Sequence, residues 1–145
     1  MNHIAILGID GTENTPQVGF NTYSQTLFIF GRSIPLYGVT FYEKIQNWLG
    51  NYMLSNPRYL QFDLMLTSFN CATAKCLMSI FRLLQSYNKN TDTEIVINWY
   101  YEIGDEDSKE AGYDFKDLIK SDIQFNILPL NDTSDFKNML NINLN

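Results

Sequence analysis

The stretch Ser68-Phe69-Asn70-Cys71-Ala72-Thr73-Ala74-Lys75 marks the point where a predicted strand runs directly into a predicted helix. Before this junction, apolar residues recur at the strand period of two: Leu60, Phe62, Leu64 and Leu66. After it, apolar residues recur at helical spacing: Ala74, Leu77, Met78, Phe81 and Leu84. A buried strand followed at once by an amphipathic helix is typical of an α/β protein.

Asn70 stands where the N-cap of this helix is expected. Its side-chain oxygen is placed to accept a hydrogen bond from the backbone N–H of Ala72 or Thr73, which lack partners within the helix. Cys71, Ala72 and Thr73 then form the first turn, where the free N–H groups and the helix dipole favour negative charge. A hydroxyl in this turn is well placed to carry a phosphate, although the same residues also suit a plain strand-to-helix turn.

Composition limits the classes of protein and partner. The 145 residues are 45% apolar and 18% charged, which predicts one globular domain. The net charge is -6 and no stripe of Lys and Arg is present, which argues against nucleic acid or an anionic membrane as partner. Two cysteines, Cys71 and Cys76, make no disulfide framework and indicate a reducing compartment. With neither a signal peptide nor an apolar stretch of about 20 residues, a cytoplasmic location is expected.

The pattern along the chain predicts the element order β-β-α-β-α-β-α-β. Strands are expected at 17–20, 26–30, 59–67, 94–101 and 123–128, with a strand or loose arm at 3–7. Helices are expected from Val39 to before Asn56, over 71–87, and from about Asp105 to before Ser121. Residues 1–130 are predicted to form the domain, and 131–145 a C-terminal tail that is either a short helix or mobile.

This alternation predicts an α/β fold with a mixed, mostly parallel sheet of four to five strands and right-handed crossovers. Helices are expected largely on one face. Strand 59–67 alternates apolar residues with Gln61, Asp63 and Thr67, so the other face should be partly wet. Trp99 is expected in the core and Tyr100 on the wetter face.

Three further groups are candidate chemical sites. One is Trp99-Tyr100-Tyr101, which could form a stacking platform, but the residues of a strand point to alternate faces. Cys71 at a helix start is a candidate nucleophile if the only histidine, His3, folds over it, but a small half-buried residue is the simpler interpretation. The acids Glu102, Asp105, Glu106, Asp107 and Glu110 offer oxygen ligands without the glycine of an EF-hand, and the helix dipole alone explains them. Neither a metal site nor a cofactor site is predicted, and enzymatic function is not supported.

Several short motifs, taken in order, resemble the SiaC family of bacterial regulatory phosphoproteins. They are Thr15-Pro16, Gly31-Arg32-Ser33-Ile34-Pro35, Phe41-Tyr42, Trp48-Leu49, Phe69-Asn70, Lys75, Trp99-Tyr100-Tyr101-Glu102, Asp105-Glu106-Asp107 and Gly112. The resemblance covers about residues 14 to 130 and implies a STAS-like fold, similar to anti-sigma-factor antagonists. It also implies a non-enzymatic switch, which a Ser/Thr kinase phosphorylates and a PP2C-type phosphatase restores. In the better-known case the unmodified form activates a diguanylate cyclase, an enzyme of cyclic di-GMP signalling.

This sequence departs from the family pattern at the switch. The family motif after Phe-Asn is typically Thr-Ser-Ser, and its phosphorylated threonine matches Cys71 here. The following serine is Ala72, so only Thr73 keeps a hydroxyl. The family's Pro-Glu-Asn is replaced by Pro35-Leu36-Tyr37, which removes a negative charge.

Two hypotheses follow from this departure. Either Thr73 has become the phosphorylated residue, or the chain binds its partner constitutively. In both, the partner is expected to contact Asn70, Cys71, Ala72, Thr73 and Lys75. A phosphate would add about -1.5 to -2 charges there and block docking of a partner over the same spot. A small enzyme dependent on Cys71 is the remaining alternative, and the oligomeric state is left open.

Overall fold

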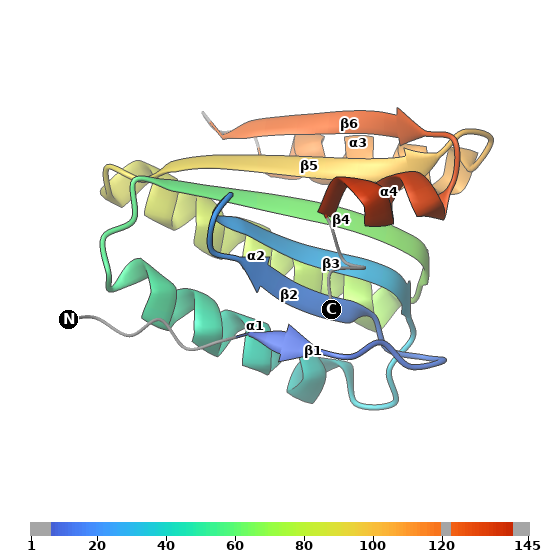
Figure 1. Ribbon diagram of the computed structural model, residues 1–145, viewed down its shortest axis with the longest axis horizontal. Coiled ribbons are helices and arrows are strands. Elements are labelled where there is room, and N and C mark those ends of the chain that lie inside the picture. Colours follow the sequence, from blue (N-terminus) through green and yellow to red (C-terminus); the bar gives the residue numbers. More distant parts are fainter. Residues whose placement is uncertain (1–6, 120–122, 141–145) are drawn as a thin grey trace.

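A computed structural model describes residues 7–119 and 123–140 of the chain. Its centre is a six-stranded sheet in which the strands lie in the order of the sequence, from β1 to β6 (Figure 1). The strands are β1 (Gly8–Ile9), β2 (Gln17–Asn21), β3 (Thr26–Ser33), β4 (Tyr59–Phe69), β5 (Glu94–Glu102) and β6 (Gln124–Leu130). The helices are α1 (Gly38–Met53), α2 (Cys71–Asn90), α3 (Glu106–Ile119) and α4 (Thr133–Leu140).

The directions of the strands place three helices on one face. β1–β2 and β2–β3 are antiparallel pairs, whereas β3, β4, β5 and β6 pair in parallel. Each connection between parallel neighbouring strands is a right-handed crossover. Because the chain adds these strands in one direction along the sheet, the crossover helices all lie on the same face. Accordingly, α1, α2 and α3 lie behind the sheet in Figure 1, and α4 lies in front of it.

The large core fills the space between the sheet and these three helices. Alternate residues of β4 and β5 point into it, including Phe62, Leu64 and Trp99, all fully buried. Trp99 Nε1 donates to the carbonyl oxygen of Ser108, 2.9 Å away. The close approach of α3 to the Trp99 ring requires Gly112, since a Cβ there would lie 2.5 Å from Trp99 Cδ1.

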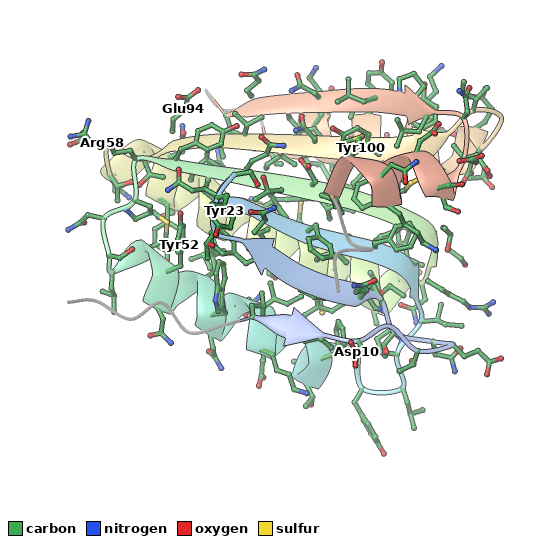
Figure 2. All side chains as sticks on the ribbon, viewed as in Figure 1. Asp10, Tyr23, Tyr52, Arg58, Glu94 and Tyr100 are labelled. Atoms are coloured by element: carbon green, nitrogen blue, oxygen red, sulfur yellow. The ribbon has the colours of Figure 1, made fainter. Side chains whose placement is uncertain are left out.

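The opposite face is divided into an apolar half and a polar half. Phe136 of α4 is fully buried against Met65 and Tyr100, and its ring centroid lies 5.4 Å from that of Tyr100. Figure 2 shows Tyr100 beside α4. The rest of the face carries Asp63 and Asn98, joined by a hydrogen bond. The second face was predicted to be partly wet. It is polar at these positions, but Asp63 and Asn98 are only 2% and 7% exposed, so the prediction is wrong for them.

The structure has the predicted fold class and element order and differs from the predictions in detail. The sheet has six strands, not four to five, because the two residues of β1 pair with β2. Tyr100 lies on the second face, as predicted, but it is buried there because α4 covers it, which corrects its expected exposure. α2 extends to Asn90, three residues beyond the expected end. The part of the expected strand at 3–6 and the tail at 141–145 lie outside the described residues. Within the described residues, no helix is long and apolar enough to cross a membrane.

Candidate functional site

The junction between β4 and α2 has the predicted cap. Asn70 takes an extended conformation, and its Oδ1 accepts a hydrogen bond of 2.9 Å from the backbone N–H of Thr73. The backbone N–H of Ala74 donates to the carbonyl oxygen of Asn70 at 3.0 Å. The strand therefore changes into a helix without a connecting loop, and the first turn of α2 is held at the carboxyl end of β4.

Thr73 is locked into the interior by a chain of hydroxyl groups. It is 0% exposed, and its Oγ1 donates to the carbonyl oxygen of Ser33 at 2.9 Å. Ser33 Oγ lies 2.8 Å from Thr73 Oγ1 and 2.7 Å from the hydroxyl of Tyr42. Because the Thr73 proton is used on the carbonyl, Ser33 donates to Thr73 and Tyr42 donates to Ser33. Burial raises the pKa of Tyr42 to about 12, which keeps this donor protonated.

This network argues against Thr73 as an accessible phosphorylation site. A kinase would have to reach a hydroxyl that is fully buried and hydrogen-bonded to the end of β3. Thr73 is buried, whereas Cys71, Ala72 and Lys75 are exposed and Asn70 is partly exposed. The predicted contact set is thus divided, with Thr73 beneath the surface and the other four residues on it.

An apolar segment adjoins this surface. Leu36, Tyr37 and Val39 are exposed large apolar residues in the turn before α1 and at its start. Gly38 brings the segment close to α2, since a Cβ on it would lie 3.4 Å from Cβ of Ala72. The exposed residues of this region form a candidate contact for a partner, named the docking surface: Leu36, Tyr37, Val39, Cys71, Ala72 and Lys75. A cleft of about 420 Å³ between α1 and α2 continues it, with Val39 on one side and Lys75 on the other.

The remaining candidates are not assembled into a catalytic site by the described residues. Cys71 is an exposed free thiol, and His3 lies outside the described residues. Burial raises the pKa of the Cys76 thiol above its ordinary value, which disfavours the thiolate. Among the residues that the structure describes, no three His, Cys, Asp or Glu side chains gather as metal ligands. Trp99 is fully buried and provides no stacking surface.

Two contributors to this region were not predicted from the sequence. Ser33 stood out in the sequence only as part of a motif, yet its hydroxyl bonds both Thr73, 40 residues away along the chain, and Tyr42. Leu36 and Tyr37 stood out in the sequence only as replacements within a family motif. The run of apolar residues around Gly38, directly after Pro35, was a signal for an exposed apolar turn.

The fold and the site define a mixed α/β protein with an exposed strand-to-helix junction. The chain belongs to the SiaC family: the model of the "SiaC family regulatory phosphoprotein" matches residues 9–130. An uncharacterized protein of Pseudomonas aeruginosa strain UCBPP-PA14, PA14_02130, is 24% identical over 111 residues, covering 77% of this chain and 87% of that protein.

Solved structures agree on the fold. SiaC of Pseudomonas aeruginosa, in its complex with the diguanylate cyclase SiaD that it activates, matches with a TM-score of 0.78 and 23% identity. The match covers 86% of this chain and 99% of that one. Apo-SiaC matches with a TM-score of 0.76 and 22% identity over 86% of this chain and 98% of that chain.

Proposed function

We propose that this chain is a non-enzymatic cytoplasmic signalling protein that binds a diguanylate cyclase through the docking surface. Membership of a family of regulatory phosphoproteins supports the regulatory role. The complex of SiaC with SiaD supports a cyclase as the class of partner. The apolar side chains of Leu36, Tyr37 and Val39 supply area that a partner can bury, and Lys75 adds a positive charge beside them.

The chain binds its partner constitutively, without control by phosphorylation in the first turn of α2. The observation that carries this is the complete burial of Thr73 next to exposed Cys71 and Ala72. Neither exposed residue has a hydroxyl that a Ser/Thr kinase modifies. A kinase and a PP2C-type phosphatase would therefore regulate this chain at Thr73 only through local opening of α2, with loss of its bonds to Ser33.

Two exposed lysines of α2 give a matched test of the surface. Lys75 lies at the docking surface, and Lys89 lies in the last turn of the same helix. Isothermal titration of a purified diguanylate cyclase from the same genome should show weaker binding for Lys75→Gln than for wild type. Lys89→Gln should bind as wild type does. Equal affinities for both variants and wild type would contradict the assignment of this surface.

Mass spectrometry separates constitutive from phosphorylation-dependent binding. After incubation with the family kinase of the same genome and ATP, wild type is expected to remain unmodified at Thr73 and to keep its affinity for the cyclase. Stoichiometric phosphate on Thr73 together with loss of binding would overturn the constitutive account.

A further inference from the structure

The geometry points to a second feature of the same face: a pocket beside the junction that accepts an arginine side chain of the partner. The inference rests on the proposed function, because it names the chemistry of the partner at that interface. The pocket lies where two neighbouring strands separate. β4 and β5 pair only as far as Leu64 and Trp99, whereas β3 stays paired with β4 up to Phe69.

This separation leaves a cavity of about 270 Å³ at the carboxyl end of β4 and the start of α3. The cavity is below the range of about 300–1,000 Å³ usual for small-molecule pockets, so a single side chain is the better occupant. Its walls include Thr67, Phe69, Asp105, Asp107 and Ser108. Phe69 directly precedes the Asn70 cap, so the cavity adjoins the docking surface.

One wall contains a polar atom with no partner. Ser108 is only 6% exposed, and its Oγ has no hydrogen-bond partner among the described residues. Buried hydroxyls are nearly always hydrogen-bonded, and an unpaired one costs stability. A hydrogen-bond donor from outside the chain would satisfy this oxygen.

The negative charge of the cavity walls favours a positively charged hydrogen-bond donor. Asp105 and Asp107 both line the cavity, and no basic residue is among its described walls. Asp105 Oδ1 caps α3 by accepting a 3.1 Å hydrogen bond from the backbone N–H of Ser108, which leaves its other oxygen to bind a ligand. Carboxylates and a hydroxyl oxygen are all acceptors, and the planar guanidinium of arginine presents five donors and no acceptor. It fits this set better than the single ammonium of lysine.

The pocket can be tested on the free chain with N-acetyl-arginine amide as the probe, followed by NMR of the ¹⁵N-labelled protein. Saturable shifts are expected at the amides of Phe69 and of residues 105–108. N-acetyl-citrulline amide, which has the same shape without the charge, should leave them unchanged. Equal shifts with both probes, or shifts elsewhere only, would overturn the inference. So would Ca²⁺ that shifts the same amides at lower concentration than the arginine probe, because it would indicate a cation site.

Variants locate the binding groups. Combined Asp105→Asn and Asp107→Asn should weaken arginine binding by about tenfold or more, while Asn at 105 keeps the helix cap. Glu106→Gln, an exposed change in the same turn outside the cavity walls, should bind within about twofold of wild type. Ser108→Ala should weaken binding while the melting temperature stays equal or rises, because a buried unpaired hydroxyl is removed. Unchanged arginine affinity in the double variant or in Ser108→Ala would contradict the pocket.

These titrations use neither the cyclase nor the first turn of α2, so the two proposals fail separately. Absence of arginine binding, with Lys75→Gln still weakening cyclase binding, would remove the pocket alone. Arginine binding with cyclase affinity unaffected by Lys75→Gln would support the pocket and contradict the docking surface.

Discussion

Asp63 and Asn98 face each other in register across the parallel strands β4 and β5, and Asn98 Nδ2 donates a 2.9 Å hydrogen bond to Asp63 Oδ1. Asn126, the register partner of Asn98 on β6, donates to Asn98 Oδ1 at 2.9 Å. Gln61 Nε2 lies 3.0 Å from both carboxylate oxygens. This ladder fixes the pairing of three strands, because a slip of one residue would send each polar side chain to the opposite face.

The burial of Asp63 makes stability depend on pH. Burial raises the pKa of the Asp63 carboxyl above its ordinary value of 3.8, against the opposing effect of the hydrogen bonds from Asn98 and Gln61. The native state therefore keeps this proton to higher pH than the unfolded chain does. As pH rises from below 3.8 through the native pKa, the contribution of Asp63 to stability falls.

Asp63→Asn should remove this dependence. Relative to wild type, the variant should gain unfolding free energy between pH 3 and pH 7, by about 1.4 kcal/mol for each pH unit that separates the native and unfolded pKa values. Urea unfolding at a series of pH values measures the change. Asp114→Asn, at an exposed position of α3, is the control. A constant difference between Asp63→Asn and wild type across the pH range would contradict the argument.

Thr73→Val tests the hydroxyl chain. The substitution keeps the branched shape but removes one of the two donors to the Ser33 carbonyl, which the backbone N–H of Asn70 also bonds at 3.3 Å. It also leaves the buried Ser33 hydroxyl without Thr73 Oγ1 as its acceptor, so it should destabilise the fold by about 1–3 kcal/mol. Thr40→Val, exposed in the first turn of α1, should change stability by less than about 0.5 kcal/mol. Denaturant unfolding compares the pair, and equal stabilities would show that the chain of hydroxyls contributes nothing net.

Two helical glycines differ in the space around them. Gly112→Ala places a Cβ 2.5 Å from Trp99 Cδ1, which should cost about 1–3 kcal/mol through overpacking. Gly50→Ala in α1 meets only the Tyr87 hydroxyl at 3.8 Å and should stabilise by about 0.5–1 kcal/mol. Opposite signs in thermal unfolding are expected. A stabilised Gly112→Ala variant would mean that α3 does not approach Trp99 this closely.

Much of this architecture follows from sequence pattern, because each crossover helix and each central strand carries its own periodicity. The cap at Asn70 and the core position of Trp99 were predicted for this reason and are confirmed. β1 was missed since two residues are too short to show a period. The burial of Thr73 depends on its contact with Ser33. The two residues lie far apart in the sequence, so no local pattern encodes this contact. The burial of Tyr100 likewise depends on α4, whose apolar periodicity is weak.

If binding of the wild-type chain is constitutive, as proposed, Cys71→Thr should introduce a phosphorylation switch. The residue at 71 is exposed in the first turn of α2, where the free N–H groups and the helix dipole tolerate a phosphate. With the family kinase and ATP, mass spectrometry should find phosphate at position 71 of the variant and none in wild type. The phosphorylated variant should lose cyclase binding, and the unmodified one should keep it. Phosphorylation of the variant without loss of binding would place the docking surface elsewhere.

The docking surface is tested most directly by the affinity of Ala72→Glu for the cyclase. The new carboxylate stands at the centre of the proposed contact but at the favourable end of the helix dipole, so the fold should be unaffected. Burying this charge against a partner should reduce affinity by about tenfold or more. Ser86→Glu, exposed on the same helix away from the junction, should bind as wild type does. A correctly folded Ala72→Glu variant with wild-type affinity would contradict the proposal that the partner covers this turn.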